Sequence, residues 1–398
     1  MKVLMITNRL YPFGGAETYA YSVGESLKNE GHIVEYFGID YKYDSFRNNY
    51  GIYAKKSHTP FSIVRSKGNC SRLSKLLDLF KPDIVHLHLI YFTLTPAIIY
   101  TIKQHNIPII QTIHDSKWIC PNYQLFIPNK KKACHECIDG HFFRCVKNRC
   151  FKNSYILSAL AYIESRYYQD KKVMSLIDRF IFPSTFMRDL HQKYGLETEK
   201  CITLCNFSRI SLEDERKNNQ SEFGKYVLYF GRLSKEKGMD NLLRICDILK
   251  NIKFVIAGEG DYSSLFKKKQ NCVVVGFKNG RDLLDLITQS ICTVYPSIWY
   301  ENCPLSVIES LTLGVPVVAS NIGGIPDLIS DGQDGFLIDC DNVELFAKKI
   351  ENIYYDVNMR ENMSDSAIKL STVFSKKTHV LKLIDIYSEV INENDNIE

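Results

Sequence analysis

The chain has no long apolar segment of the kind that directs secretion or crosses a membrane. Its N-terminal run, Met1–Arg9, has too few consecutive apolar residues for a signal peptide. A window at 84–102 contains no Asp, Glu, Lys or Arg, but it includes two histidines, a proline and several threonines and tyrosines. We therefore expect a buried strand, a loop and a helix start there, in place of a membrane span. The predicted location is the cytoplasm, and whether the protein lies at the inner face of the membrane is left open.

Three further absences narrow the function. No segment repeats at the period of a solenoid. The glycine pair Gly258 and Gly260 lacks the third glycine of a dinucleotide fingerprint, so a nicotinamide cofactor is poorly supported. The lysine context that a pyridoxal-dependent phosphorylase would need is not found either.

At 398 residues the chain is too long for one ordinary core. We predict two domains, residues 1–206 and 207–373, and the polar stretch at 211–224 is typical of a linker. Residues 1–206 hold 28 Lys and Arg against 17 Asp and Glu, a net charge of +11, whereas the remainder holds 22 against 28, a net of −6. The first half thus favours an anionic partner, although a solvated basic face explains the same numbers.

Short apolar runs alternate with helical patterns in both halves, which is typical of parallel sheets with helices on both faces. The predicted fold class is therefore α/β, with two Rossmann-like doubly wound domains facing across a cleft. The predicted strands lie at 3–7, 33–38, 84–89, 109–113, 180–183 and 202–204 in the first half, and at 227–230, 254–257, 273–275, 293–295 and 316–319 in the second.

Residues directly after each strand are the first candidates for a site, because ligands of open α/β sheets collect at the carboxyl ends of the strands. Gly14 and Gly15 follow the first strand, where glycine permits close backbone approach and a helix N-terminus can receive an anion. Arg232 and Lys237 follow the strand at 227–230. Their loop suits a diphosphate, since arginine binds two oxygens at once and lysine acts as a point charge. A plain turn and a solvated basic loop remain the alternatives.

The segment Glu301–Glu309 places two carboxylates eight residues apart. Pro304 is favoured in the first turn of a helix, and apolar residues from Leu305 onward recur at helical spacing. Glu301 should therefore precede the helix and Glu309 should lie within it. Two glutamates at this spacing also occur by chance in many helices.

The same segment predicts a binding site for a nucleotide sugar. Backbone N–H groups at about 302–306 would point out of the helix N-terminus, where phosphate and polar oxygens bind. The carboxylates can accept hydrogen bonds from the hydroxyl groups of ribose and hexose. Gly323 and Gly324 follow a later strand, and we expect their backbone to pack against the cleft's occupant.

Taken in order, these motifs resemble the family 4 retaining glycosyltransferases of the GT-B fold, over nearly the full length of the chain. No single motif is decisive, but their order and spacing are specific. The motifs that carry the resemblance are Gly14-Gly15-Ala16-Glu17, Thr112-Ile113-His114-Asp115, Gly231-Arg232 with Lys237-Gly238, Ala257-Gly258-Glu259-Gly260, Glu301 with Glu309, Gly323-Gly324-Ile325-Pro326 and Asp334-Gly335-Phe336.

The resemblance implies an enzyme that moves a hexose or N-acetylhexosamine from a nucleotide sugar, with UDP as the expected carrier. The acceptor would be a saccharide, expected to be lipid-linked, in surface polysaccharide or glycan synthesis. No catalytic metal and no nucleic acid partner are expected. A helix at about 374–391 should pack back onto the first domain.

The resemblance also assigns roles to individual residues. Arg232 and Lys237 would bind the donor diphosphate, and Glu309 would accept from the ribose. Glu301 would hold the donor sugar, and His114 would reach that sugar from the first domain. The expected catalytic residues are Arg232, Lys237, Glu301 and His114, and the expected donor-binding residues are Gly15, Gly231, Gly258, Asn302, Cys303, Pro304, Leu305 and Glu309.

Five of the thirteen cysteines crowd into an insert at about 116–152. Without a signal peptide we expect reduced thiols, and four thiolates on a lysine-rich, strand-poor loop suit a structural tetrahedral zinc. Free thiols, or a disulfide formed under oxidising conditions, are the alternatives. The expected ligands are Cys134, Cys137, Cys145 and Cys150, with Cys120, His135 and His141 as alternative ligands.

The cysteines are surrounded by basic residues, Lys130, Lys131, Lys132, Arg144, Lys147, Arg149 and Lys152. Our hypothesis is that this insert shapes an acceptor site beside an anionic membrane or a lipid-diphosphate-linked sugar. A zinc-knuckle nucleic-acid binder would explain the insert but would leave the motifs of the second half without a role. A nucleotide-sugar epimerase or an inactive sugar-nucleotide binding protein would keep the fold and change the activity.

Overall fold

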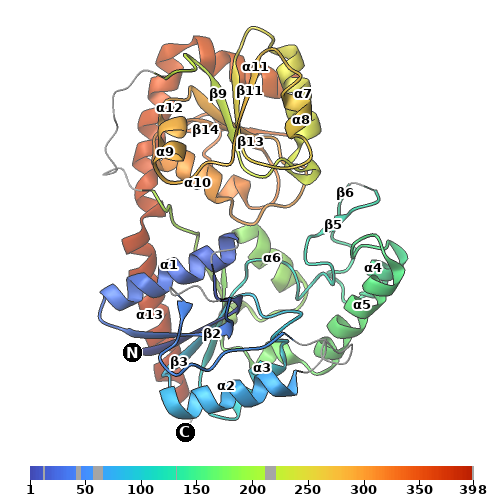
Figure 1. Cartoon of the computed structure of the whole chain (residues 1–398), viewed down its shortest axis with the longest axis vertical. Coiled ribbons are helices and arrows are strands. Elements are labelled where there is room, and N and C mark those ends of the chain that lie inside the picture. The colour runs from blue at the N-terminus through green and yellow to red at the C-terminus, as the bar shows by residue number, and fades with distance from the viewer. Residues whose placement is uncertain (12–13, 42–45, 57–65, 131, 211–220, 397–398) are drawn as a thin grey trace. The chain divides into compact units, whose positions relative to one another are not determined.

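The computed structural model of the chain describes all residues except 12–13, 42–45, 57–65, 131, 211–220 and 397–398 (Figure 1). Most of the proposed linker at 211–224 and Lys131 of the basic insert thus lie outside the described residues. The chain forms two compact units. Unit 1 comprises residues 1–130, 134–205 and 379–398, and unit 2 comprises residues 131–133 and 206–378.

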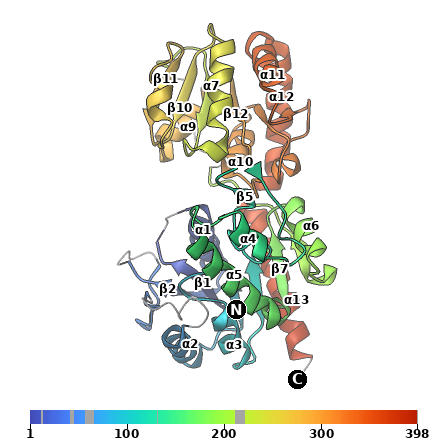
Figure 2. The same ribbon diagram turned by 90° about the vertical axis from the view of Figure 1, so that its right-hand side faces the viewer.

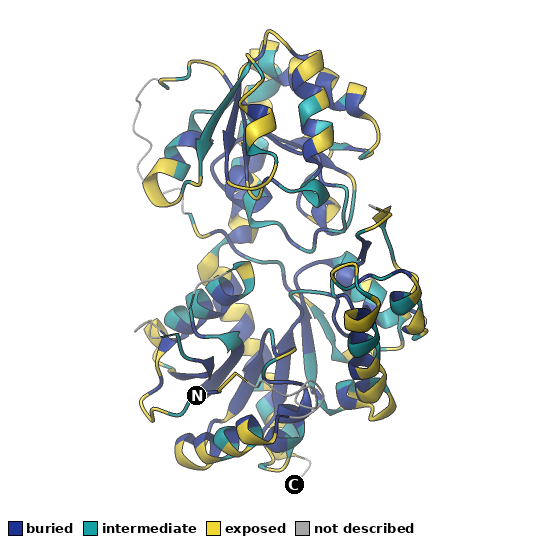
Figure 3. Cartoon of the chain, turned by 45° about the vertical axis from the view of Figure 1, so that its right-hand side comes forward, coloured by how far each residue is buried: buried dark blue, intermediate teal, exposed yellow. Residues whose placement is uncertain are grey.

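Unit 1 is built on a six-stranded parallel sheet of order β2-β1-β3-β4-β7-β8. Its central strands are buried because their apolar side chains pack under helices on both sides (Figure 3). The strands are β1 (Lys2–Arg9), β2 (Ile33–Ile39), β3 (Ile84–Leu87), β4 (Ile109–Thr112), β7 (Arg179–Phe182) and β8 (Cys201–Thr203). The helices are α1 (Gly15–Asn29), α2 (Lys67–Phe80), α3 (Ala97–Lys103), α4 (Phe143–Lys147), α5 (Tyr155–Asp170) and α6 (Thr185–Lys193).

The helix α13 (Lys376–Asp395) contributes its residues from His379 onward to unit 1. The hydroxyl group of Tyr387 lies 2.6 Å from Nδ1 of His86 on β3. Nε2 of His379 lies 2.8 Å from the hydroxyl group of Tyr19 on α1. Unit 1 is therefore completed by a segment that follows unit 2 in the sequence.

Unit 2 has a second six-stranded parallel sheet, of order β11-β10-β9-β12-β13-β14 (Figure 2). Its strands are β9 (Val227–Phe230), β10 (Phe254–Ala257), β11 (Cys272–Gly276), β12 (Cys292–Tyr295), β13 (Val317–Ser320) and β14 (Gly335–Ile338). The helices are α7 (Met239–Ile248), α8 (Ser263–Phe266), α9 (Gly280–Thr288), α10 (Leu305–Thr312), α11 (Val343–Tyr355) and α12 (Val357–Leu370).

The predicted α/β class, with two doubly wound parallel sheets, is confirmed. All eleven predicted strands are present, and the window at 84–102 forms β3, a turn and the start of α3, as expected. The sequence reading missed β14, and it also missed the two-residue strands β5 (Phe126–Ile127) and β6 (Lys132–Ala133) in the cysteine-rich insert. Within the described part of the chain, no helix is long and apolar enough to cross a membrane.

Candidate active site

The strand order of unit 2 reverses between β9 and β12, since the chain builds outward from β9 in one direction and then from β12 in the other. In an open α/β sheet, ligands bind in the crevice at the carboxyl ends of the strands beside such a switch point. Gly231 and Arg232 follow β9, and Ser297 and Glu301 follow β12. The predicted phosphate and sugar residues of unit 2 therefore lie where this topology places a ligand.

A cavity of about 560 Å³ opens at this point, which is within the range of small-molecule sites. It brings together five of the predicted residues, namely Gly231, Arg232, Gly258, Leu305 and Glu309. Its other lining residues include Arg209 from the segment before β9, Phe230 on β9, and Phe277, Lys278, Asn279 and Gly280 after β11.

Gly258 is required by the close approach of two loops on this cavity. It has a φ of +153°, and a Cβ atom there would lie 1.8 Å from the carbonyl oxygen of Gly231. No other residue fits this position without separating the loops after β9 and β10. The glycine thus brings backbone, in place of a side chain, to the wall of the cavity.

Lys237 and Glu301 form an ion pair beside a smaller cavity of about 80 Å³ that both residues line. Nζ of Lys237 lies 2.7 Å from Oε1 of Glu301, and the hydroxyl group of Ser297 donates to the same oxygen at 2.9 Å. Both side chains are largely buried. Arg232 also lines this smaller cavity, so the two predicted cations and Glu301, predicted to hold the sugar, line the same cavity.

The structure gives further detail on two predictions about this segment. Gly323 and Gly324 pack against protein backbone: the N–H of Gly324 donates to the carbonyl oxygen of Glu301 at 2.7 Å, and a Cβ at Gly323 would lie 2.4 Å from that oxygen. Pro304 occupies the N-cap position of α10 with an extended backbone, so the first helical turn begins at Leu305. Asn302 and Cys303 precede the cap.

Glu309 lies within α10, as predicted, and its side chain is almost fully buried. Burial raises its pKa, and the guanidinium group of Arg209 opposes this effect by donating two hydrogen bonds to Oε1, at 2.6 and 2.8 Å. Arg209 was not identified from the sequence. It is 100 residues away from its partner, and its only local signal is a basic residue just before the polar stretch at 211–224.

In unit 1 the predicted residues Gly15 and His114 lie beside the carboxyl ends of β1 and β4. Gly14 is the N-cap of α1 and Gly15 is its first residue. Nε2 of His114 lies 3.1 Å from Nδ1 of His88, and the ring of Tyr19 on α1 packs edge-on against both imidazoles. Burial lowers the pKa of His114 to about 3, so the imidazole is neutral at physiological pH. His88 is a second residue that sequence reasoning missed.

Comparison with known proteins agrees with this geometry. Residues 13–207 match the family described as Glycosyltransferase Family 4, and residues 211–370 match the family described as Glycosyl transferases group 1. An uncharacterised glycosyltransferase of Methanocaldococcus jannaschii is 25% identical and covers 93% of this chain and 93% of its own length. The chain belongs to the family 4 glycosyltransferases.

Two further relatives are informative. An Escherichia coli UDP-Gal:α-D-GlcNAc-diphosphoundecaprenol α-1,3-galactosyltransferase is 26% identical over 42% of this glycosyltransferase and 43% of its own length. The solved structure of Anabaena HepE in complex with UDP-glucose superposes with a TM-score of 0.66 at 16% identity, covering 98% of this chain and 100% of that chain. At this identity the superposition establishes the GT-B fold.

The cysteines of the insert form most of a small satellite core. Cys137, Cys145 and Cys150 are buried with Ile127 and Phe142, and Cys134 packs against them. Cys120 is buried as well, and burial raises its pKa to about 11. None of the thirteen cysteines forms a disulfide.

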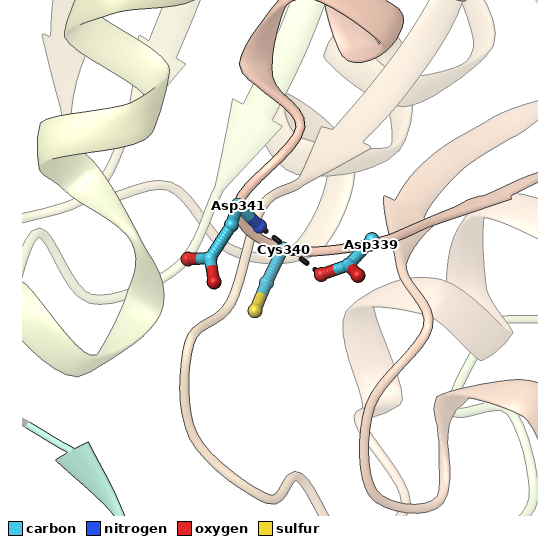
Figure 4. A group of neighbouring side chains, drawn as sticks. All are labelled: Asp339, Cys340 and Asp341. Atoms are coloured by element: carbon cyan, nitrogen blue, oxygen red, sulfur yellow. Dashed lines mark hydrogen bonds between the residues drawn. The ribbon is translucent and has the colours of Figure 1, made fainter.

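The sulfur atoms of the clustered cysteines do not form a group close enough to hold one metal ion among the described residues. Among the described residues, the one group of three or more metal-binding side chains whose donor atoms lie within 4.8 Å of one another is Asp339, Cys340 and Asp341 (Figure 4). These three residues are consecutive, and Asp339 and Asp341 are exposed, as acidic groups without a bound ion commonly are. The clustered thiols would have to draw closer to share one ion.

Proposed function

We propose that this glycosyltransferase moves a hexose or N-acetylhexosamine from a UDP-sugar to a saccharide acceptor with retention of configuration, in glycan or surface polysaccharide synthesis. The observation that carries the proposal is the pair of adjoining cavities at the switch point of unit 2. Glu309 lines the larger one, Lys237 and Glu301 line the smaller one, and Arg232 lines both. A nucleoside and a sugar, joined by a diphosphate, match this order of groups.

The nucleoside would occupy the larger cavity. Phe277 is 66% exposed at the end of β11 and lines this cavity, so its ring is available to stack on a base. Glu309 lies beside Arg209 on the wall of this cavity and would accept hydrogen bonds from the ribose hydroxyl groups. The UDP-glucose complex of Anabaena HepE, which shares the fold, supports uridine as the base.

The diphosphate would lie between Arg232 and Lys237. Breaking the sugar–phosphate bond builds negative charge on the departing phosphate, so fixed cations aimed at it stabilise the transition state more than the ground state. The backbone N–H groups that open α10 add to this stabilisation. These groups perform the charge stabilisation that a metal ion performs in other transferases.

Glu301 is assigned to holding the donor sugar and not to nucleophilic attack. One of its oxygens is engaged by Lys237 and Ser297, which leaves the other to accept from a sugar hydroxyl group. We infer that the acceptor attacks from the face that the phosphate leaves, within an ion pair, and that neutral His114 donates to or accepts from the donor sugar.

The acceptor proposed here is a saccharide on a lipid diphosphate at the cytoplasmic face of a membrane. The Escherichia coli relative supports this choice, because its own named acceptor is a diphosphoundecaprenol-linked sugar. The positive charge of residues 1–206 supports it independently, since both the lipid diphosphate and the surface of an anionic bilayer are negative.

A two-stage experiment tests the proposal. Calorimetry with a panel of nucleotide sugars should find one that binds, and nuclear magnetic resonance of the product formed with extracted lipid-linked saccharides should show the anomeric configuration of the donor preserved. Hydrolysis or epimerisation without transfer would contradict it, and so would inversion of the anomeric centre.

A further inference from the structure

The helix α5 exposes apolar residues and buries polar ones, the reverse of an ordinary surface helix. Its inward face consists of Ser158, Ala161, Glu164, Ser165 and Tyr168. Its outward face carries Ile156, Ile163 and Tyr167, which are 75%, 53% and 36% exposed. Positions 7 and 11 residues apart lie on one line along a helix, so these three form a single stripe.

The orientation of α5 is fixed from within. The carboxylate of Glu164 forms an ion pair with Nζ of Lys117 at 2.7 Å, and the two side chains are 1% and 3% exposed. The hydroxyl group of Ser158 accepts the backbone N–H of Phe151 at 3.0 Å. Turning the apolar stripe inward would break this ion pair and leave the buried charge of Lys117 without its partner, which is strongly unfavourable. The exposed stripe is therefore built into unit 1.

The apolar surface continues onto the neighbouring helix α4, which packs against α5 (Figures 1 and 2). Phe143 on α4 is 62% exposed, and its ring meets that of Tyr162 edge-on. Tyr155, at the first position of α5, is 59% exposed and lies under the guanidinium group of Arg149. We call the surface formed by Phe143, Tyr155, Ile156, Ile163 and Tyr167 the α4–α5 face.

Cations surround this face. Residues 141–172 contain seven Lys and Arg against two Asp and Glu, a net of +5. Of the two acidic residues, Glu164 is buried against Lys117 and Asp170 is paired with Arg166 at 2.9 Å. Lys152 precedes the stripe and Lys171 follows it, each with its side chain exposed. Long cationic side chains in these places can reach lipid phosphates while the apolar stripe enters the acyl boundary.

We propose that the α4–α5 face binds the surface of an anionic lipid bilayer, with α5 lying in the plane of the interface. The inference rests on the proposed lipid-linked acceptor, since the α4–α5 face would bind the membrane that contains this acceptor. Charge complementarity selects this occupant over a second copy of the chain, because two like faces of net positive charge would repel each other.

Sedimentation of the purified full-length chain with vesicles tests the assignment. Binding is expected to phosphatidylcholine vesicles that contain phosphatidylglycerol, and it should weaken at high salt and on pure phosphatidylcholine. The variant Ile156→Ser/Ile163→Ser should lose about tenfold or more in partitioning, since two apolar side chains no longer enter the interface. The matched control, Leu79→Ser/Leu381→Ser, removes two exposed leucines from α2 and α13 of the same unit and should partition like the unaltered chain.

The assignment is overturned if the unaltered chain does not bind anionic vesicles, or if the α5 variant binds as well as the control. It is also overturned if the unaltered chain is a dimer that the α5 variant converts to a monomer, because the face would then belong to a second copy. Calorimetry with UDP on the same samples separates the two proposals. A chain that binds vesicles but no nucleotide would contradict the donor site alone.

Discussion

At the scale of single residues, the proposed donor site is a set of charges that already compensate one another. Lys237 is held by Glu301, and Glu309 is held by Arg209. Because each charge has a fixed partner at a short distance, it is oriented before any ligand arrives. The site is therefore preorganised, and substitutions there should affect turnover much more than folding.

Lys237→Ala should lower kcat about 100-fold or more, because it removes a cation aimed at the departing phosphate. Steady-state transfer assays measure this, and circular dichroism checks the fold. Lys235→Ala is the matched control, since Lys235 belongs to the same loop but pairs with Asp240 on the outside. A kcat equal to that of the unaltered enzyme in the Lys237 variant would contradict the assigned role.

Glu309→Gln should raise KM for the donor about tenfold to 100-fold, because a carboxylate accepts hydrogen bonds from hydroxyl groups more strongly than an amide does. The effect on kcat should be smaller, since the ribose is remote from the bond that breaks. Glu344→Gln, at an exposed position of unit 2, serves as the control. If the Glu309 variant binds UDP as tightly as the control in calorimetry, the ribose assignment is wrong.

At the scale of elements, the cysteine-rich insert has only a small core of its own. We propose that Cys134, Cys137, Cys145 and Cys150 hold a structural zinc, with Cys120 as the alternative ligand. The thiols are clustered and largely buried, and burial raises the pKa of Cys120 and Cys137, so binding would have to release protons.

Metal analysis of protein purified without chelator should then find about one zinc per chain. Cys137→Ser/Cys145→Ser should lose the metal and expose the insert to proteolysis, whereas Cys340→Ser, outside the cluster, should keep it. Folded protein that contains no zinc would rule out the proposal.

At the scale of the whole molecule, unit 1 should lose stability on mild acidification. Burial lowers the pKa of His86 and His114 to about 3, and that of His191 and His379 to about 4, from an ordinary value of 6.5. Below about pH 6.5 the unfolded chain therefore binds protons that the folded chain does not. Each histidine then costs about 1 kcal/mol of folding free energy per pH unit, down to its folded pKa.

Asp115 acts in the opposite direction, because burial raises its pKa to about 6 from 3.8. Burial raises the pKa of Glu17 in the same direction as that of Asp115, and it lowers the pKa of His88 as it does for the other histidines. Two carboxyl groups do not offset five buried histidines, so Tm should fall as the pH falls from 7 to 5. The variant His379→Gln should flatten this profile, since glutamine does not become charged. Scanning calorimetry across this range measures both slopes, and a Tm independent of pH would contradict the assignment of neutral histidines.

The sequence predicts the fold and those site residues that lie in recognisable local motifs. It does not predict contacts between segments that are far apart in the sequence. The eleven strands and the place of Glu309 within a helix follow from local periodicity, which a single segment carries. The Arg209–Glu309 pair, the His88–His114 contact and the contact of Gly324 with Glu301 each join segments far apart in the sequence. No local pattern encodes such contacts. The Lys237–Glu301 pair shows the same limit, since both residues were identified but their contact was not.

The return of α13 to unit 1 also has a consequence for how the protein is made. Residues 379–395 supply Tyr387 and His379, which close buried hydrogen bonds with His86 and Tyr19. A ribosome makes these residues only after it has made the whole of unit 2, at about 5–20 residues per second. For that interval His86 and Tyr19 of the nascent unit 1 lack these two contacts, so a folding chaperone would find a binding surface on unit 1 until α13 has been made.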